Sequence, residues 1–134
     1  IIHCREGLDE TLDVLRQFRR TGTPRLLFHS FTYGSDEACR ILEEHEAFFG
    51  INGVVTFKNA ATLRDAVRHI GIERIVLETD APWLAPTPYR GRRNESSYLR
   101  EICSKVAEVT ELDFSEAERI TDRNARRILA LEQE

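Results

Sequence analysis

Leu77-Glu78-Thr79-Asp80-Ala81-Pro82-Trp83-Leu84-Ala85-Pro86 is the stretch around which this sequence is organised. It continues the apolar run Arg74-Ile75-Val76-Leu77, which is typical of a buried strand. Glu78 and Asp80 follow this strand, and the prolines then prevent a helix or strand from continuing. A carboxylate at the C-terminal end of a buried parallel strand lies where α/β barrels place their chemistry, and it can ligate a divalent cation. Taken alone, the same residues also suit an Asp80 that caps the following turn and a Glu78 that pairs with an arginine.

The composition describes an ordinary globular chain. The 134 residues suit a single domain, residues 1–134, with 41% hydrophobic and 31% charged residues. A net charge of −4 argues against general nucleic-acid binding through a basic field, but not against an enzyme that contacts a few phosphates locally. No apolar run is long enough for a membrane span, and no signal peptide is recognisable. The three cysteines are scattered, which indicates neither a zinc finger nor a disulfide framework and fits a cytoplasmic location.

Two further predicted strands end in histidine. Ile1 to Cys4 contains His3, and Arg25 to His29 follows after a helix predicted over Asp9 to Arg20, which Gly22 and Pro24 would end. A single histidine at a strand end is more often a hydrogen-bonded core residue than a ligand. Adjacent parallel strands, however, lie about 4.8 Å apart, so both histidines can converge with Asp80 on one ion.

The rest of the chain reads as alternating strands and helices, a parallel α/β architecture. The spacing of apolar residues predicts a third strand and four further helices. The strand covers Ala47 to Val55, and the helices cover Asp36 to Glu44, Ala60 to Ile70, Glu95 to Val109 and Asp122 to Leu131, with a short additional helix opening at Ser115. Ser35, Asn59 and Asn94 are the predicted N-caps.

Several single residues carry expectations of their own. Gly50 and Gly53 indicate a close backbone approach or a bulge in the third strand. His45 and His69 are expected at the surface, and Cys39 is expected as a small buried residue.

The stretch from Glu78 to Pro86, followed by Tyr89-Arg90-Gly91-Arg92-Arg93-Asn94-Glu95, closely resembles the TatD family of metal-dependent deoxyribonucleases. Further blocks of the resemblance lie at Ile1–Arg5, His29–Phe31, Gly53–Ala60 and Asn124–Arg127. The resemblance covers essentially the whole chain and implies the C-terminal half of a TIM (β/α)8 barrel, namely its last four βα units plus C-terminal helices. Because such a barrel needs roughly 250 residues, and because the sequence contains no methionine, we expect residues to precede Ile1.

The same resemblance implies the chemistry of the site. His3, His29 and Asp80 would be metal ligands, and Asp80 would also be the catalytic residue that orients water. Glu78 would not contact the ion itself but would hold a metal ligand or an arginine in position. Phosphate contacts are expected from the basic residues around the site: Arg5, Arg90, Arg92 and Arg93. The implied activity is divalent-metal-dependent hydrolysis of phosphodiester bonds in DNA, as an exonuclease, with Mg, Mn or Zn as the ion.

The sequence also departs from this family. Its usual His-x-His pair and a further glutamate have no counterpart here, and the turn after His29 is one residue longer. Metal affinity and activity of the chain alone are therefore expected to be weak. Two other functions stay open, a metal-dependent amide or aminoacyl-ester hydrolase on the same barrel and a catalytically inert fragment. Half a barrel would also expose strand edges, which predicts aggregation or the self-association of two copies.

Overall fold

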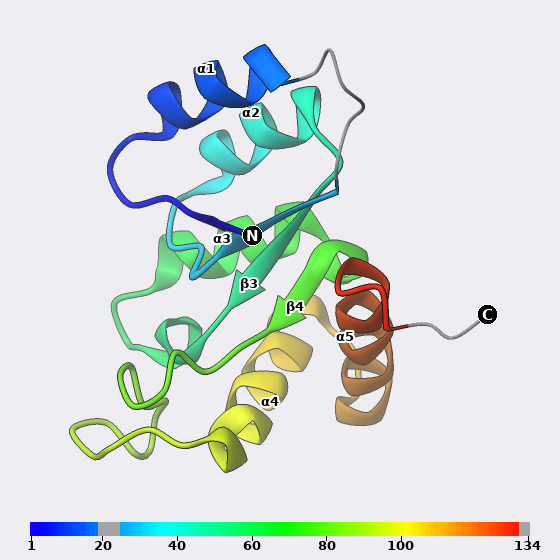
Figure 1. Ribbon diagram of the computed structural model, residues 1–134. Helices are drawn as coiled ribbons and strands as arrows, with labels where there is room; N and C mark the ends of the chain where they lie inside the picture. Colours follow the sequence, from blue (N-terminus) through cyan, green and yellow to red (C-terminus); the bar gives the residue numbers. More distant parts are fainter. Residues whose placement is uncertain (19–24, 132–134) are drawn as a thin grey trace.

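The computed structural model describes residues 1–18 and 25–131. Within them lies one four-stranded parallel sheet whose strands follow one another in chain order. Its strands are β1 (Ile2–His3), β2 (Leu26–His29), β3 (Ala47–Ile51) and β4 (Ile75–Leu77). A helix lies between each strand and the next, as Figure 1 shows, which is the βα repeat of an α/β barrel. The predicted alternation of parallel strands and helices is confirmed.

Four helices cover one face of this sheet. They are α1 (Leu8–Phe18), α2 (Ser35–Glu44), α3 (Ala61–Ile70) and α4 (Leu99–Thr110). Their apolar sides pack on alternate strand residues, among them the buried Phe28, Phe49 and Ile75. Because successive side chains of a strand point to opposite faces, the residues between these belong to the other face.

That other face is divided between a helix and the polar strand ends. The helix α5 (Phe114–Ile128) lies beside β4 in Figure 1. Its Ala125 and Ile128 pack against three strand residues: Leu27, Phe48 and Val76. Two positions further along the same strands, on the same face, come His29, Gly50 and Glu78. The apolar part of the face therefore lies under α5, and the C-terminal strand ends beyond it carry the candidate site.

The third strand ends earlier than predicted. It stops at Ile51 instead of Val55, and a short 3₁₀ helix, η2 (Gly53–Thr56), follows. Asn52 opens this turn, since its side-chain oxygen accepts from the backbone N–H of Val54 at 3.1 Å. An apolar run does not distinguish a strand from a buried turn, which explains the error. The expected close backbone approach is confirmed at Gly53, where a Cβ atom would collide with the Leu84 carbonyl, whereas at Gly50 the close neighbour is the side chain of Glu78.

Two helix starts were also predicted wrongly. Helix α2 is capped by Gly34, whose N–H donates to the Glu37 carboxylate at 3.0 Å, so Ser35 is already its first residue. Helix α3 has Ala60 at its N-cap position and no side-chain cap, so the predicted cap at Asn59 is wrong. The predicted continuation of α1 to Arg20, and its end at Gly22 and Pro24, lie outside the described residues.

The fourth βα unit differs in its boundaries as well. A 3₁₀ turn, η3 (Ile72–Arg74), precedes β4, and another, η4 (Ser96–Tyr98), precedes α4. Helix α4 therefore starts at Leu99 rather than Glu95, and the predicted cap at Asn94 is wrong because Tyr98 holds the N-cap position. The two C-terminal helices predicted from the sequence, a short one from Ser115 and one over Asp122 to Leu131, are one continuous helix, α5, which is capped by Asp113 and ends at Ile128. Asn124 is a buried polar residue within this helix. Its side-chain amide donates to the carbonyls of Ile72 and Ile75, at 2.8 and 2.9 Å, so its polar group has partners in the interior.

Three predictions about the burial of single residues have different outcomes. The prediction that His45 lies at the surface is wrong, because this residue is only 6% exposed. Its backbone N–H donates to the Ile41 carbonyl at the end of α2, and the buried strand β3 follows shortly after it. The prediction that Cys39 is buried is also wrong. The residue is half-buried, and its Sγ lies 2.8 Å from Nε2 of His69. His69 is exposed as predicted. Among the helices of residues 1–18 and 25–131, none has the length and apolar character that a bilayer span requires.

Candidate functional site

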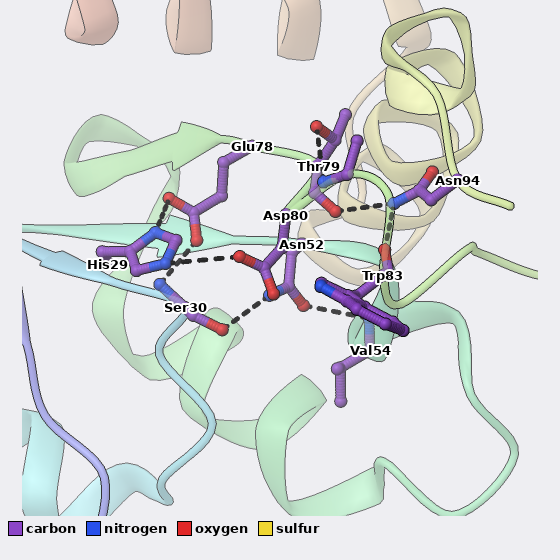
Figure 2. A network of polar contacts seen from close by, with 10 residues as sticks. His29, Ser30, Asn52, Val54, Glu78, Thr79, Asp80, Trp83 and Asn94 are labelled. Atoms are coloured by element: carbon purple, nitrogen blue, oxygen red, sulfur yellow. Dashed lines mark hydrogen bonds and ion pairs between the residues drawn. The ribbon is translucent and has the colours of Figure 1, made fainter.

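The site is built where strands β2 and β4 end. His29 is the last residue of β2, and Nδ1 of its ring lies 2.9 Å from Oε2 of Glu78, the residue after β4. The other Glu78 oxygen accepts the backbone N–H of Ser30 at 2.5 Å. Both oxygens of Glu78 are thus held by the end of β2, as Figure 2 shows.

Glu78 makes these contacts across an intervening strand. Strand β3 lies between β2 and β4, and Gly50 is the residue over which the carboxylate passes. A Cβ atom at Gly50 would stand 2.6 Å from Cδ and 2.9 Å from Oε1 of Glu78. Gly50 therefore leaves the space that the Glu78 carboxylate occupies, and a side chain at this position would displace that carboxylate.

The second nitrogen of His29 faces Asp80. An Nδ1–H that donates to Glu78 leaves a lone pair on Nε2, and this atom lies 3.5 Å from Oδ1 of Asp80. Two ligands at about 2.0–2.1 Å from one tetrahedral ion are roughly 3.4 Å apart. The two atoms are spaced as a pair of ligands would be, and a cation between them would relieve the repulsion of their lone pairs. His29 Nε2 and Asp80 Oδ1 are therefore suited to be two of the ligands of one divalent ion.

His3 lies next to this pair but does not complete it. It stands opposite His29 in the register of β1 and β2, with ring centroids 5.7 Å apart. Among the described residues, no three side chains of histidine, cysteine, aspartate or glutamate converge with the geometry of a metal site. The structure thus brings together His29, Glu78 and Asp80 and places His3 beside them. The ligand roles of His3, His29 and Asp80 remain predictions.

The basic residues expected at the site separate into two places. Arg5 is exposed in the loop after β1. Arg90, Arg92 and Arg93 line a hollow of about 570 Å³ together with Trp83. Arg90 lies over the ring of Phe57, with Cζ 3.6 Å from the ring centroid. The arginines of the long loop are thus gathered beside the Asp80 loop, and Arg5 does not line their hollow.

Two buried asparagines support the site, and neither role was predicted. Asn52 is 1% exposed and donates to Oγ of Ser30 at 2.8 Å, which joins the loops after β2 and β3. Asn94, predicted only as a helix cap, donates from Nδ2 to the carbonyls of Thr79 at 2.7 Å and Trp83 at 2.6 Å. These contacts enclose Asp80, whose φ of 58° is the left-handed conformation that aspartate tolerates better than most residues. An asparagine directly after a buried strand was the available signal for Asn52.

The sequence profile of the family described as TatD related DNase matches residues 1–130. The chain is 35% identical to the uncharacterized metal-dependent hydrolase YabD of Bacillus subtilis over 131 residues, 98% of this chain and 51% of YabD. It is 33% identical to the uncharacterized metal-dependent hydrolase YcfH of Escherichia coli K12, over 98% of this chain and 49% of YcfH. The chain therefore spans about half the length of the curated relatives it matches.

Solved structures agree on the fold. A TatD-family hydrolase from Entamoeba histolytica superimposes with a TM-score of 0.81 at 20% identity, over 94% of this chain and 48% of that structure. The TatD homologue YjjV from Escherichia coli K12 gives 0.80 at 21% identity, with the same coverage of 94% and 48%. The predicted partial (β/α)8 barrel is confirmed by these likenesses and by the parallel sheet.

Proposed function

Because this chain belongs to the TatD-related DNase family, we propose that it contributes part of a divalent-metal site that hydrolyses phosphodiester bonds in DNA. The observation that carries the proposal is the facing pair of His29 Nε2 and Asp80 Oδ1, 3.5 Å apart, with Glu78 fixed on the far nitrogen of the ring. Support comes also from relatives that are named metal-dependent hydrolases.

The donor chemistry indicates which residues would hold the ion. His29 and Asp80 would ligate it, with His3 as a third ligand from the neighbouring strand. Imidazole suits zinc and manganese, while a carboxylate also suits magnesium, so the donors leave these ions open. When bound, such an ion lowers the pKa of a water molecule and neutralises charge on the phosphate. With so few protein ligands, we expect the ion to bind weakly to this chain alone and its activity to be small.

The protein residues around the ion have separate tasks. With its proton on Nδ1, His29 donates a hydrogen bond to Glu78, and this contact holds the ring so that Nε2 is directed at the ion. Asp80 can accept a hydrogen bond from the attacking water and so orient it towards the phosphate. Arg90, Arg92 and Arg93 follow on the same loop and supply positive charge for the DNA backbone, and Arg5 supplies it from the β1 side.

The experiment compares three proteins: the wild-type chain, Asp80→Asn and Asp65→Asn. Asp65 is a matched control, since it is an exposed aspartate of α3 paired with Arg68. Release of nucleotides from labelled single-stranded DNA is measured with Mg²⁺ or Mn²⁺, and binding of Mn²⁺ is followed separately by electron paramagnetic resonance. We expect Asp80→Asn to lose Mn²⁺ binding and nucleotide release, chelator to abolish release, and Asp65→Asn to behave as wild type.

Equal release by wild type and Asp80→Asn would contradict the proposal. Aminoacyl-ester and amide substrates are assayed in parallel, because the same residues can serve such reactions. Turnover of those substrates without release from DNA would support the alternative hydrolase. Metal binding without any turnover would support a chain that holds the ion but lacks the remainder of the site.

A further inference from the structure

Trp83 is the chain's single tryptophan and one of its most exposed large apolar residues, with 72% of its surface open to solvent. Tryptophan usually buries most of its ring, because that burial is a large part of its contribution to stability. A ring left open beside a candidate catalytic loop therefore requires an explanation. Figure 2 shows the indole at the edge of the polar network that contains Asp80.

The backbone that carries this ring is held firmly. The N–H of Trp83 donates to the Asp80 carbonyl at 2.9 Å, and its own carbonyl accepts from the buried Asn94 at 2.6 Å. The next carbonyl, of Leu84, packs against Gly53, where no side chain would fit. The ring is thus displayed by a preorganised turn, and a partner that covers it has little backbone entropy to overcome.

The surroundings of the ring are basic. The hollow that Trp83 lines also contains Arg90, Arg92 and Arg93, and no acidic side chain of the described residues lines it. Arg90 is occupied with the ring of Phe57, whereas the side chains of Arg92 and Arg93 form no ion pair within the described part of the chain. In a protein of net charge −4, this is a local site for an anion that also has an aromatic face.

We propose that Trp83 is the stacking platform for an unpaired nucleobase, with Arg92 and Arg93 binding the phosphates that flank it. The inference rests on the proposed function, and it adds a residue that positions the substrate. Every base has a π-face, so the platform accepts bases without strong sequence preference. The backbone N–H of Trp83 donates to the Asp80 carbonyl, so both side chains extend from one turn, and a nucleotide stacked on the ring would have its adjoining phosphate on the side of the His29–Asp80 pair. A base inside a duplex has no free face for Trp83.

Binding is tested without turnover, in chelator, so that its result does not depend on catalysis. The intrinsic fluorescence of Trp83 is recorded while oligothymidylate, an abasic oligonucleotide of equal length, the oligothymidylate–oligoadenylate duplex and thymidine monophosphate are added. We expect oligothymidylate to quench Trp83 and to bind about tenfold more tightly than the abasic strand. The duplex should leave the fluorescence unchanged, and the free nucleotide should bind more weakly than the strand because it lacks the second phosphate.

The variants Trp83→Leu and Phe18→Leu separate stacking from general effects, with binding followed by the anisotropy of a labelled strand. Phe18 is a matched control, an exposed aromatic residue of α1. Trp83→Leu should bind oligothymidylate about tenfold more weakly and the abasic strand unchanged, while Phe18→Leu should alter neither.

Equal binding of the abasic strand and oligothymidylate would overturn the proposal. So would quenching by the duplex, or an emission spectrum of Trp83 that shifts to the blue with protein concentration and is insensitive to DNA. The last result would identify a second copy of the chain as the partner of this face. If Trp83 binds bases while wild type and Asp80→Asn release nucleotides equally, the proposed function fails and the stacking platform stands.

Discussion

The substitution Gly50→Ala tests the central geometric claim, that an empty position in β3 seats the Glu78 carboxylate. The added Cβ atom would stand 2.6 Å from Cδ and 2.9 Å from Oε1 of Glu78, closer than such atoms approach in proteins. Strand β3 is bounded by a strand on each side, and the Gly50 carbonyl accepts the N–H of Phe31 at 3.0 Å, so the backbone has little room to move. We expect the Glu78 side chain to move instead.

The cost follows from what Glu78 would lose. Its hydrogen bonds to His29 Nδ1 and Ser30 N involve a charged acceptor, and such bonds contribute about 1.5–3 kcal/mol each. The side chains of His29 and Glu78 are 30% and 17% exposed, so water replaces part of the loss. Alanine also gains about 0.5–1 kcal/mol over glycine within a strand. The net decrease in the free energy of unfolding should be about 2–3 kcal/mol.

A double-mutant cycle with Glu78→Ala isolates this contact. Without the carboxylate the added methyl group has space, so Gly50→Ala should be neutral or stabilise by up to about 1 kcal/mol in that background. Urea unfolding followed by circular dichroism gives all four stabilities, and the predicted coupling is about 3 kcal/mol. If the two substitutions add within about 0.5 kcal/mol, Glu78 does not occupy the space above Gly50 and the site has been described wrongly.

Further predictions concern the supports of the fold and its open edges. Asn124→Ala should destabilise the chain by about 1–3 kcal/mol in urea, because it removes the side-chain donor of the buried Ile75 carbonyl, whereas the Ile72 carbonyl keeps the backbone N–H of Ile75. Asn94→Ala should increase the mobility of the long loop, measured as a fall in tryptophan anisotropy, since two carbonyls lose their donor. Burial raises the pKa of the Cys103 thiol, so the folded state favours the neutral form. The contribution of this thiol to the free energy of unfolding should persist at neutral pH and decline in alkaline solution as the pH rises through the raised pKa, and Cys103→Ala should remove this decline. The outer edges of β1 and β4 pair with no further strand among the described residues, so sedimentation should show concentration-dependent self-association, and a monomer at high micromolar concentration would contradict this.

The existence and order of the strands could be predicted because their residues are apolar on both faces and end at polar residues. Strand β2 was predicted to within one residue, and its terminal His29 was recognised. The end of β3 was missed because the apolar run continues through Val55, although Asn52 and Gly53 interrupt it with residues typical of a turn. The pattern of apolar residues therefore located each strand, but the end of β3 depends on the hydrogen bond between the Asn52 side chain and the N–H of Val54.

Helix ends were less predictable for a related reason. A polar residue before a helix is only one of several ways to satisfy its first N–H groups. In α2 the carboxylate of Glu37 turns back to Gly34, so that Ser35 is not needed as a cap. In α5 the predicted break before Asp122 does not exist, and Asn124 further along donates to carbonyls around β4, a contact over about 50 residues of chain that no local window contains.

The same distinction separates the predicted ligands from the residues that hold them. His29 and Asp80 each follow a recognisable strand, so the chain suggests them one at a time. Their relation depends on Glu78, which reaches β2 only by crossing β3 at Gly50, and this crossing exists only in the assembled register. Residues of the same face two positions earlier pack under α5. The site is thus the polar continuation of a packed apolar face, and its geometry is inherited from that packing: loosening α5 should move Glu78 and His29 before it unfolds the sheet.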